Sequence, residues 1–190
     1  MTKDKDFKRL VRARAEQTGE PYSSARRSLV EQPTEAAPQV ADLRPVEKPG
    51  LGFTVWVPRD WAEFPPQPTN NAYEVARFQY RDEHRHICLV FRHPGAVGLS
   101  PHVPADLIRR DREAKGFENF TADEMEIGGW PAVRLDYSTT RFGFGEWFVR
   151  DYLLVAHNVV LELGLGSSVP EVDGPTFDEM AARFTAEAPT

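Results

Sequence analysis

The sequence predicts an α+β fold in which a mostly antiparallel β-sheet is sandwiched between helices. Three strand-like segments follow one another closely, at 130–139, 145–156 and 158–167, with short gaps that contain glycine or asparagine. This spacing is typical of an antiparallel meander. A single amphipathic helix follows the last strand. Strands that come in runs, with helices between and after them, favour α+β over alternating βαβ units.

The terminal helix is predicted from a start signal and from its period. Thr176 and Glu179 match the T-x-x-E capping box, which places the helix start at Thr176. The apolar residues that follow recur with helical spacing and would cover one face of the sheet: Phe177, Met180, Ala181 and Phe184. Trp147 and Phe148 point to opposite faces of their strand, so we expect both faces of the sheet to be covered.

Further elements precede the meander. We expect strands at 53–57, 72–81, 86–92 and 122–127, and a helix at 105–115 that Gly116 ends. These elements complete a body at residues 51–188.

Two appendages precede the body. Residues 1–31 are predicted to form a basic helical hairpin, and this length buries too little surface to fold alone. Residues 32–50 contain four prolines and are predicted to form a semi-extended linker.

The net charge of −6 is unevenly distributed: residues 1–31 carry +3 and the remainder carries −9. An acidic body is a poor general binder of nucleic acid, because phosphate contacts require clustered cations. Any nucleic-acid contact is therefore predicted to use residues 1–31, where Arg12, Arg26 and Arg27 belong to the best basic cluster. A solvated helix face, or a clamp onto the acidic body, explains the same arginines.

Three motifs occur in order along the body. They are Gly52-Phe-Thr-Val-Trp-Val-Pro58 followed by Trp61, the turn Gly129-Trp-Pro-Ala132, and the final helix with Phe177-Asp178 through Arg183-Phe184. Over about residues 51–186 this pattern resembles PsbP-like domains, a group that includes LpqN-type proteins and the import factor that binds the GTPase Ran. The resemblance implies an α/β/α sandwich and a binding or assembly role without catalysis. Residues 1–31 lie outside the resemblance.

Candidate catalytic chemistry is sparse. His84, His86 and Cys88 alternate along a predicted strand and could supply three zinc ligands. Solvated histidines at a strand entrance, beside a core cysteine, explain the same pattern. The sequence has neither a phosphate-binding glycine loop nor a nucleophile elbow, so we expect no enzyme activity and no cofactor.

The hairpin at 134–150 supplies the candidate interaction surface. Arg134 and Arg150 could pair with acidic residues across the two strands, as a structural device or as part of a concave polar patch. Phe142 and Phe144, at the tip, are either covered or exposed as a contact surface.

These observations favour a non-catalytic protein-interaction or ligand-binding module of bacterial type, with a protein partner as the first expectation. A regulatory or nucleic-acid-associated protein that uses residues 1–31 is the alternative, and a metal-dependent enzyme at His84 and His86 is the weaker one. The single cysteine, the lack of an apolar leader and the lack of a bilayer-length apolar run predict a cytoplasmic protein without a membrane segment.

Overall fold

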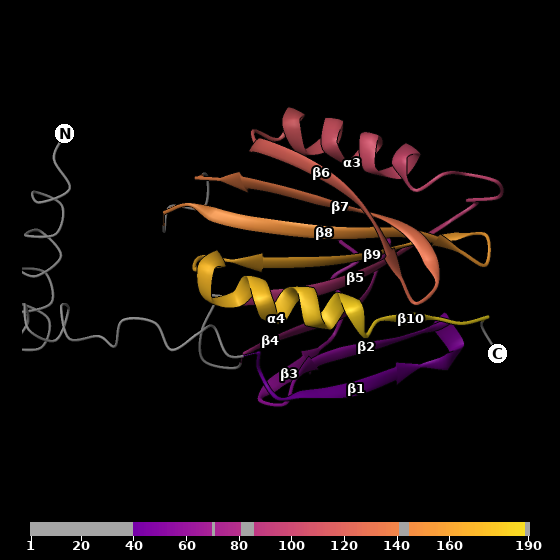
Figure 1. The fold of residues 1–190 in the computed structure, drawn as a ribbon, viewed down its shortest axis with the longest axis horizontal. Helices are drawn as coiled ribbons and strands as arrows, with labels where there is room; N and C mark the ends of the chain where they lie inside the picture. Colours follow the sequence, from indigo (N-terminus) through magenta and orange to yellow (C-terminus); the bar gives the residue numbers. More distant parts are fainter. Residues whose placement is uncertain (1–39, 70, 81–85, 141–144, 189–190) are drawn as a thin grey trace, which may run out of the picture. The chain divides into compact units, whose positions relative to one another are not determined.

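The computed structural model describes residues 40–69, 71–80, 86–140 and 145–188 (Figure 1). The chain divides into two compact units, Met1–Pro38 and Gln39–Thr190, and every described residue belongs to the second. The hairpin predicted at residues 1–31 lies outside the described residues.

The second unit is an α+β domain built on two antiparallel sheets, as the strand order predicted. The larger sheet has seven strands in the order β3-β4-β5-β9-β8-β7-β6, and the smaller has three in the order β1-β2-β10. The elements of the described residues are β1 (Leu43–Lys48), the 3-10 helix η1 (Pro49–Leu51), β2 (Phe53–Pro58), β3 (Trp61–Phe64), β4 (Glu74–Tyr80), β5 (His86–Pro94), α3 (His102–Ala114), β6 (Glu118–Ile127), β7 (Trp130–Thr139), β8 (Trp147–Ala156), β9 (Val159–Ser167), α4 (Pro170–Ala182) and β10 (Thr185–Ala186).

The predicted meander is confirmed as β7, β8 and β9, which are adjacent in the larger sheet. β7 and β8 pair antiparallel from Thr139 opposite Trp147, and β8 and β9 pair up to Ala156 opposite Val159. The turn between β8 and β9 consists of His157 and Asn158, with φ values of 49° and 65°. Two consecutive left-handed residues make a tight hairpin turn whose twist matches the flanking strands.

Two apolar clusters lie on opposite faces of the larger sheet. On one face, α4 and the smaller sheet cover a cluster that includes Phe53, Tyr152 and Phe177. On the other face, α3 covers a cluster that includes Ala105 and Leu153. Neighbouring residues of β8 therefore serve different clusters, as strand alternation requires. Figure 1 shows the two helices on separate sides of the larger sheet.

The expected separation of Trp147 and Phe148 follows the same alternation. Trp147 lines a cavity on the α3 face with Val149 and Asp151. Phe148 lies beneath the guanidinium of Arg150, whose Cζ is 5.5 Å from the ring centroid. Because Arg150 bonds to α4, Phe148 is on the α4 face.

Two sequence predictions were wrong about where elements begin. Residues 43–50 of the predicted linker 32–50 belong to β1 and to η1, because β1 pairs along its whole length with β2 and buries Leu43. The capping box at Thr176 is also wrong, because α4 already begins at Pro170. Proline suits the first turn of a helix, where its missing N–H would have no partner. The Thr176 hydroxyl instead accepts a hydrogen bond from the Ala41 backbone N–H at 3.2 Å.

Neither of the two α-helices in the described ranges is long and apolar enough to span a bilayer.

Candidate functional site

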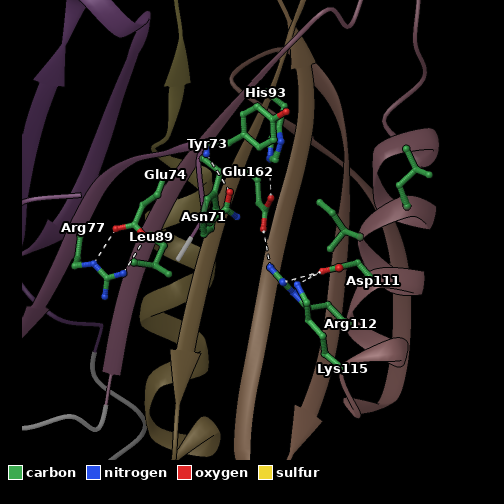
Figure 2. Close-up of a pocket in the computed structure, with 13 residues that line it drawn as sticks. Asn71, Tyr73, Glu74, Arg77, Leu89, His93, Asp111, Arg112, Lys115 and Glu162 are labelled. Atoms are coloured by element: carbon green, nitrogen blue, oxygen red, sulfur yellow. Dashed lines mark hydrogen bonds and ion pairs between the residues drawn. The ribbon is translucent and has the colours of Figure 1, made fainter. Parts of the chain in front are cut away.

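A cleft of about 710 Å³ lies between α3 and the strands β4, β5 and β9, and is called here the α3 cleft (Figure 2). Its lining residues come from these elements and from the loop before β4: Asn71, Tyr73, Glu74, Arg77, Leu89, Phe91, His93, Leu107, Ile108, Asp111, Arg112, Lys115 and Glu162. Ionisable side chains thus mix with aromatic and aliphatic ones, which is common in small-molecule sites.

Two buried carboxyl groups lie at the base of this region. Asp151 on β8 is 2% exposed and Glu162 on β9 is 1% exposed. In the register, Asp151 is opposite Gly164, two residues beyond Glu162, so the two acids are diagonal neighbours on the α3 face. Asp151 lines a smaller cavity of about 130 Å³, which shares Arg112 with the α3 cleft.

Arg112 of α3 reaches down to this acid pair. Its Nε donates to the hydroxyl of Tyr137 at 3.1 Å, and that hydroxyl donates to Oδ2 of Asp151 at 2.6 Å. Its Nη1 donates to Asp111 at 3.1 Å. The helix is thereby tied to β7 and β8 through a chain of polar contacts.

Only one of the two carboxylate oxygens of Glu162 accepts a hydrogen bond within the described residues. Its Oε2 accepts a hydrogen bond from Nε2 of His93 at 3.1 Å, since a carboxylate can only accept. Its Oε1 is buried and accepts no hydrogen bond within the described residues. The nearest cationic group is the guanidinium of Arg112, whose Nη2 is 3.8 Å away. Figure 2 shows Glu162 between His93 and Arg112.

Burial and mutual repulsion set the protonation of this cluster. Burial, followed by the negative charge of Glu162, raises the pKa of Asp151 to about 8. Burial, followed by the charge of Asp151, raises the pKa of Tyr137. Burial disfavours the charge on Arg112, but Tyr137, Asp151 and Glu162 together outweigh it and hold the pKa of Arg112 above its usual value. The cluster therefore combines a fixed cation with an acid that is mostly protonated at neutral pH.

The walls of the α3 cleft differ in character. Tyr73 and Phe91 contact the ring of His93, with centroid distances of 4.6 Å and 6.4 Å. Leu107 and Ile108 belong to α3 and line the cleft from the helix side. The aromatic wall and the aliphatic wall therefore lie on different elements, with Glu162 between them.

The two predicted candidates that the structure describes, Arg134 and Arg150, do not line this cleft. Arg150 meets Asp136 in a two-pronged ion pair, with hydrogen bonds of 2.8 Å and 2.9 Å, on the α4 face. Arg134 contacts Asp123 and lies 3.6 Å from Asp136. Cross-strand pairing of this kind is the structural device that the sequence indicated. The remaining candidates lie outside the described residues: Phe142, Phe144, Arg12, Arg26 and Arg27.

The predicted zinc ligands have other partners where the structure describes them. Nδ1 of His86 donates to Oδ2 of Asp173 at 2.7 Å. Cys88 is buried in the apolar core, and burial raises the pKa of its thiol, which disfavours the thiolate that zinc requires. His84 lies outside the described residues. Within the described ranges, no three His, Cys, Asp or Glu side chains are grouped to hold a metal ion.

Sequence reasoning missed Asp151 and Glu162, although both left a signal. Each is an acid beside a run of apolar or aromatic residues in its strand, in Asp-Tyr-Leu-Leu-Val-Ala and Val-Val-Leu-Glu-Leu. A charged residue in a strand covered on both faces is buried by necessity, and buried charges are rarely retained without a partner or a role.

Neither protein-family models nor curated protein sequences give a match to this chain. Solved protein structures do match it. Cyanobacterial PsbP (CyanoP) from Synechocystis sp. PCC 6803 is similar with a TM-score of 0.61 and 13% identity, over 82% of this chain and 98% of that protein. The chain adopts the PsbP-like fold. This confirms the fold that the sequence motifs predicted for the body.

Two further structures share the PsbP-like fold. LpqN of Mycobacterium tuberculosis, involved in cell envelope biogenesis, has a TM-score of 0.50 and 16% identity over 77% of this chain and 91% of its own. The Ran-binding protein Mog1p of Saccharomyces cerevisiae has a TM-score of 0.51 and 11% identity over 77% and 96%. The same fold thus carries different roles, and a role must be argued from the site.

Proposed function

We propose that this PsbP-like domain is a non-catalytic small-molecule-binding module whose site is the α3 cleft. The observation that carries the proposal is Oε1 of Glu162, a buried acceptor that lines the cleft without a hydrogen-bond donor among the described residues. Leaving a buried acceptor unsatisfied costs roughly 1–3 kcal/mol, and more for a charged group. A bound ligand that donates to Oε1 removes this cost.

The surrounding side chains support a binding role over a purely structural one. The Nε and Nη1 atoms of Arg112 donate to Tyr137 and Asp111, and its Nη2 lies 3.8 Å from Oε1 of Glu162, an ion pair too long to be a hydrogen bond. His93 satisfies only the other oxygen. The polar network thus stabilises α3 and leaves one buried oxygen of a cleft-lining residue without a hydrogen bond among the described residues.

The proposal of binding without catalysis rests on how the acid pair is placed. Asp151 is buried beneath Arg112 and receives the Tyr137 hydroxyl, so its carboxyl group serves the interior of the domain. Glu162 is the one member of the pair that lines the α3 cleft. A single anchor with apolar walls is suited to holding a ligand.

A small-molecule library tested against the ¹⁵N-labelled full chain by NMR examines this proposal. We expect compounds that shift the amide resonances of α3 and β9 together. Leu107→Trp, which adds a ring at the mouth of the cleft, should abolish these shifts. Val103→Trp is the matched control, because Val103 is an exposed residue of the same helix that does not line the cleft. The proposal fails if no compound perturbs the cleft residues, or if Leu107→Trp leaves binding intact.

A further inference from the structure

We infer that the ligand of the α3 cleft is an organic amine cation, whose ammonium group binds Oε1 of Glu162 and whose apolar part lies between the aromatic and aliphatic walls. This inference rests on the proposed function and names the chemical class that the site selects.

Glu162 is the group that would anchor the ligand. Glu162 is 1% exposed, so a donor that reaches Oε1 does so away from bulk water. A carboxylate binds a charged donor about twice as strongly as a neutral one, because Coulomb attraction adds to the hydrogen bond.

The basic side chains that line the cleft already have hydrogen-bond partners. Arg77 is held by both carboxylate oxygens of Glu74, each at 2.8 Å. Lys115 donates to Asp111 at 2.7 Å. Arg112 donates to Tyr137 and Asp111, and its Nη2 forms only a long ion pair of 3.8 Å with Oε1 of Glu162, without a hydrogen bond. An incoming ammonium group therefore displaces no existing hydrogen bond at that oxygen.

Aromatic rings form the wall of the cleft on the strand side. The rings of Tyr73 and Phe91 both contact the ring of His93 on the strand side. The faces of tyrosine and phenylalanine rings attract organic cations, more strongly as the cation is more fully desolvated. A carboxylate beside aromatic rings is thus matched to a cation with a hydrocarbon body, and Leu107 and Ile108 offer that body an apolar surface.

Matched pairs of ligands test the inference by isothermal titration calorimetry with the full chain. Benzylamine, phenethylamine and tryptamine are compared with the alcohols in which a hydroxyl replaces the amine. We expect each amine to bind at least about tenfold more tightly than its alcohol, a difference of about 1.4 kcal/mol. Glu162→Gln keeps an acceptor oxygen but removes the charge. It should weaken amine binding about tenfold or more and change alcohol binding less than about threefold.

Two further variants keep the test decisive. Glu126→Gln makes the same charge change on the exposed strand β6, outside the cleft, and should leave amine binding unchanged. If Glu162→Gln does not fold, Leu107→Arg is used instead, because it places a positive charge at the mouth of the cleft. It should weaken the binding of amines more than the binding of alcohols, with Leu107→Gln as its neutral control.

Alcohols that bind as tightly as amines would overturn the ligand class and leave the proposed function standing. If neither series binds and the library gives no cleft ligand, the proposed function fails as well.

Discussion

Gly164 on β9 makes room for the buried carboxyl group of Asp151 on β8. A Cβ atom placed on Gly164 would lie 3.0 Å from Oδ1 of Asp151 and 3.4 Å from the ring of Phe91. Two residues on, a Cβ on Gly166 would lie 2.6 Å from the indole of Trp147. The alternating glycines of β9 thus accommodate two large or charged side chains of β8 on the same face of the sheet.

Gly164→Ala should destabilise the domain by roughly 1–3 kcal/mol, because an added methyl group in a packed interior forces neighbours to shift. Urea denaturation followed by tryptophan fluorescence measures the change. Gly174→Ala is the control: it lies within α4, where a Cβ would meet its nearest atom at 3.7 Å. This substitution should be neutral or stabilising by up to roughly 1 kcal/mol, because alanine is the better helix former. Equal effects at the two glycines would contradict the packing argument.

Asp151 should make the stability of the domain depend on pH. Its pKa is about 8 in the folded protein, against 3.8 for an ordinary aspartate. Between these values the folded state keeps a proton that the unfolded state has lost, so rising pH favours unfolding. The contribution of Asp151 is complete below about pH 4 and is lost by about pH 8, with a slope of at most about 1.4 kcal/mol per pH unit.

Asp151→Asn should flatten this slope, because the amide stays neutral and its oxygen still accepts from Tyr137. Unfolding free energies at pH 5, 6, 7 and 8 provide the measurement. The charged and titratable groups around Asp151 come from three other elements and are unchanged in the variant: Tyr137 and Asp136 on β7, Arg112 on α3, and Glu162 on β9. Asp106→Asn, at an exposed site of α3, should keep the wild-type slope. Identical slopes for wild type and Asp151→Asn would show that the carboxyl is ionised when buried.

Arg112 should be the residue that holds α3 on the sheet. Arg112→Met preserves much of the side-chain length but leaves the buried carboxylate of Glu162 without the guanidinium 3.8 Å from its Oε1, which should cost roughly 3 kcal/mol. Hydrogen exchange should then accelerate first in α3. Arg109→Met is the matched control on the same helix, because Arg109 makes only long surface pairs of 3.8 Å and 3.9 Å. It should change stability by less than about 0.5 kcal/mol, and a comparable loss at the two sites would rule out a special role for Arg112.

The sequence could predict the sheet better than the site. The period of two in β7, β8 and β9, and the apolar spacing of Phe177 and Met180, report directly on which side chains face a core. They identified the meander and the covering helix, whereas the PsbP-like fold was predicted from a resemblance in three ordered motifs. β1 was missed because Pro45 and Pro49 resemble a linker, although a proline is tolerated in a strand at the edge of a sheet, as β1 is.

The site depends on contacts between residues that are far apart in the chain. Arg112 and Glu162 meet only because α3 packs on the sheet face that carries Glu162, and Asp151 and Glu162 become neighbours only through the β8–β9 register. No local pattern encodes these distances. What the sequence does contain is an acid beside a run of apolar or aromatic residues in each of two strands. This pattern indicates the two acids but does not indicate which side chains they contact.

Asp178 should fasten α4 to β8 on the opposite face. Its Oδ1 accepts from Nη1 of Arg150 at 2.8 Å and from the hydroxyl of Tyr152 at 2.6 Å. Burial and this hydrogen bond raise the pKa of Tyr152, so the phenol stays a donor throughout the neutral range. Asp178→Ala should cost about 1 kcal/mol, since Asp178 is itself half exposed. Glu179→Ala, which breaks only a pair with Arg183 on the same helix, should cost about 0.3–0.5 kcal/mol.

A double-mutant cycle with Tyr152→Phe tests whether this contact is specific. If the hydroxyl of Tyr152 stabilises the fold through Asp178, the double variant should lose less than the sum of the single variants, with a coupling energy of about 0.5–1 kcal/mol. The same cycle between Glu179→Ala and Tyr152→Phe should be additive within about 0.3 kcal/mol. Additivity in both cycles would mean that α4 is held by Phe177 and Met180 in the core and that the polar contacts of Asp178 contribute nothing measurable.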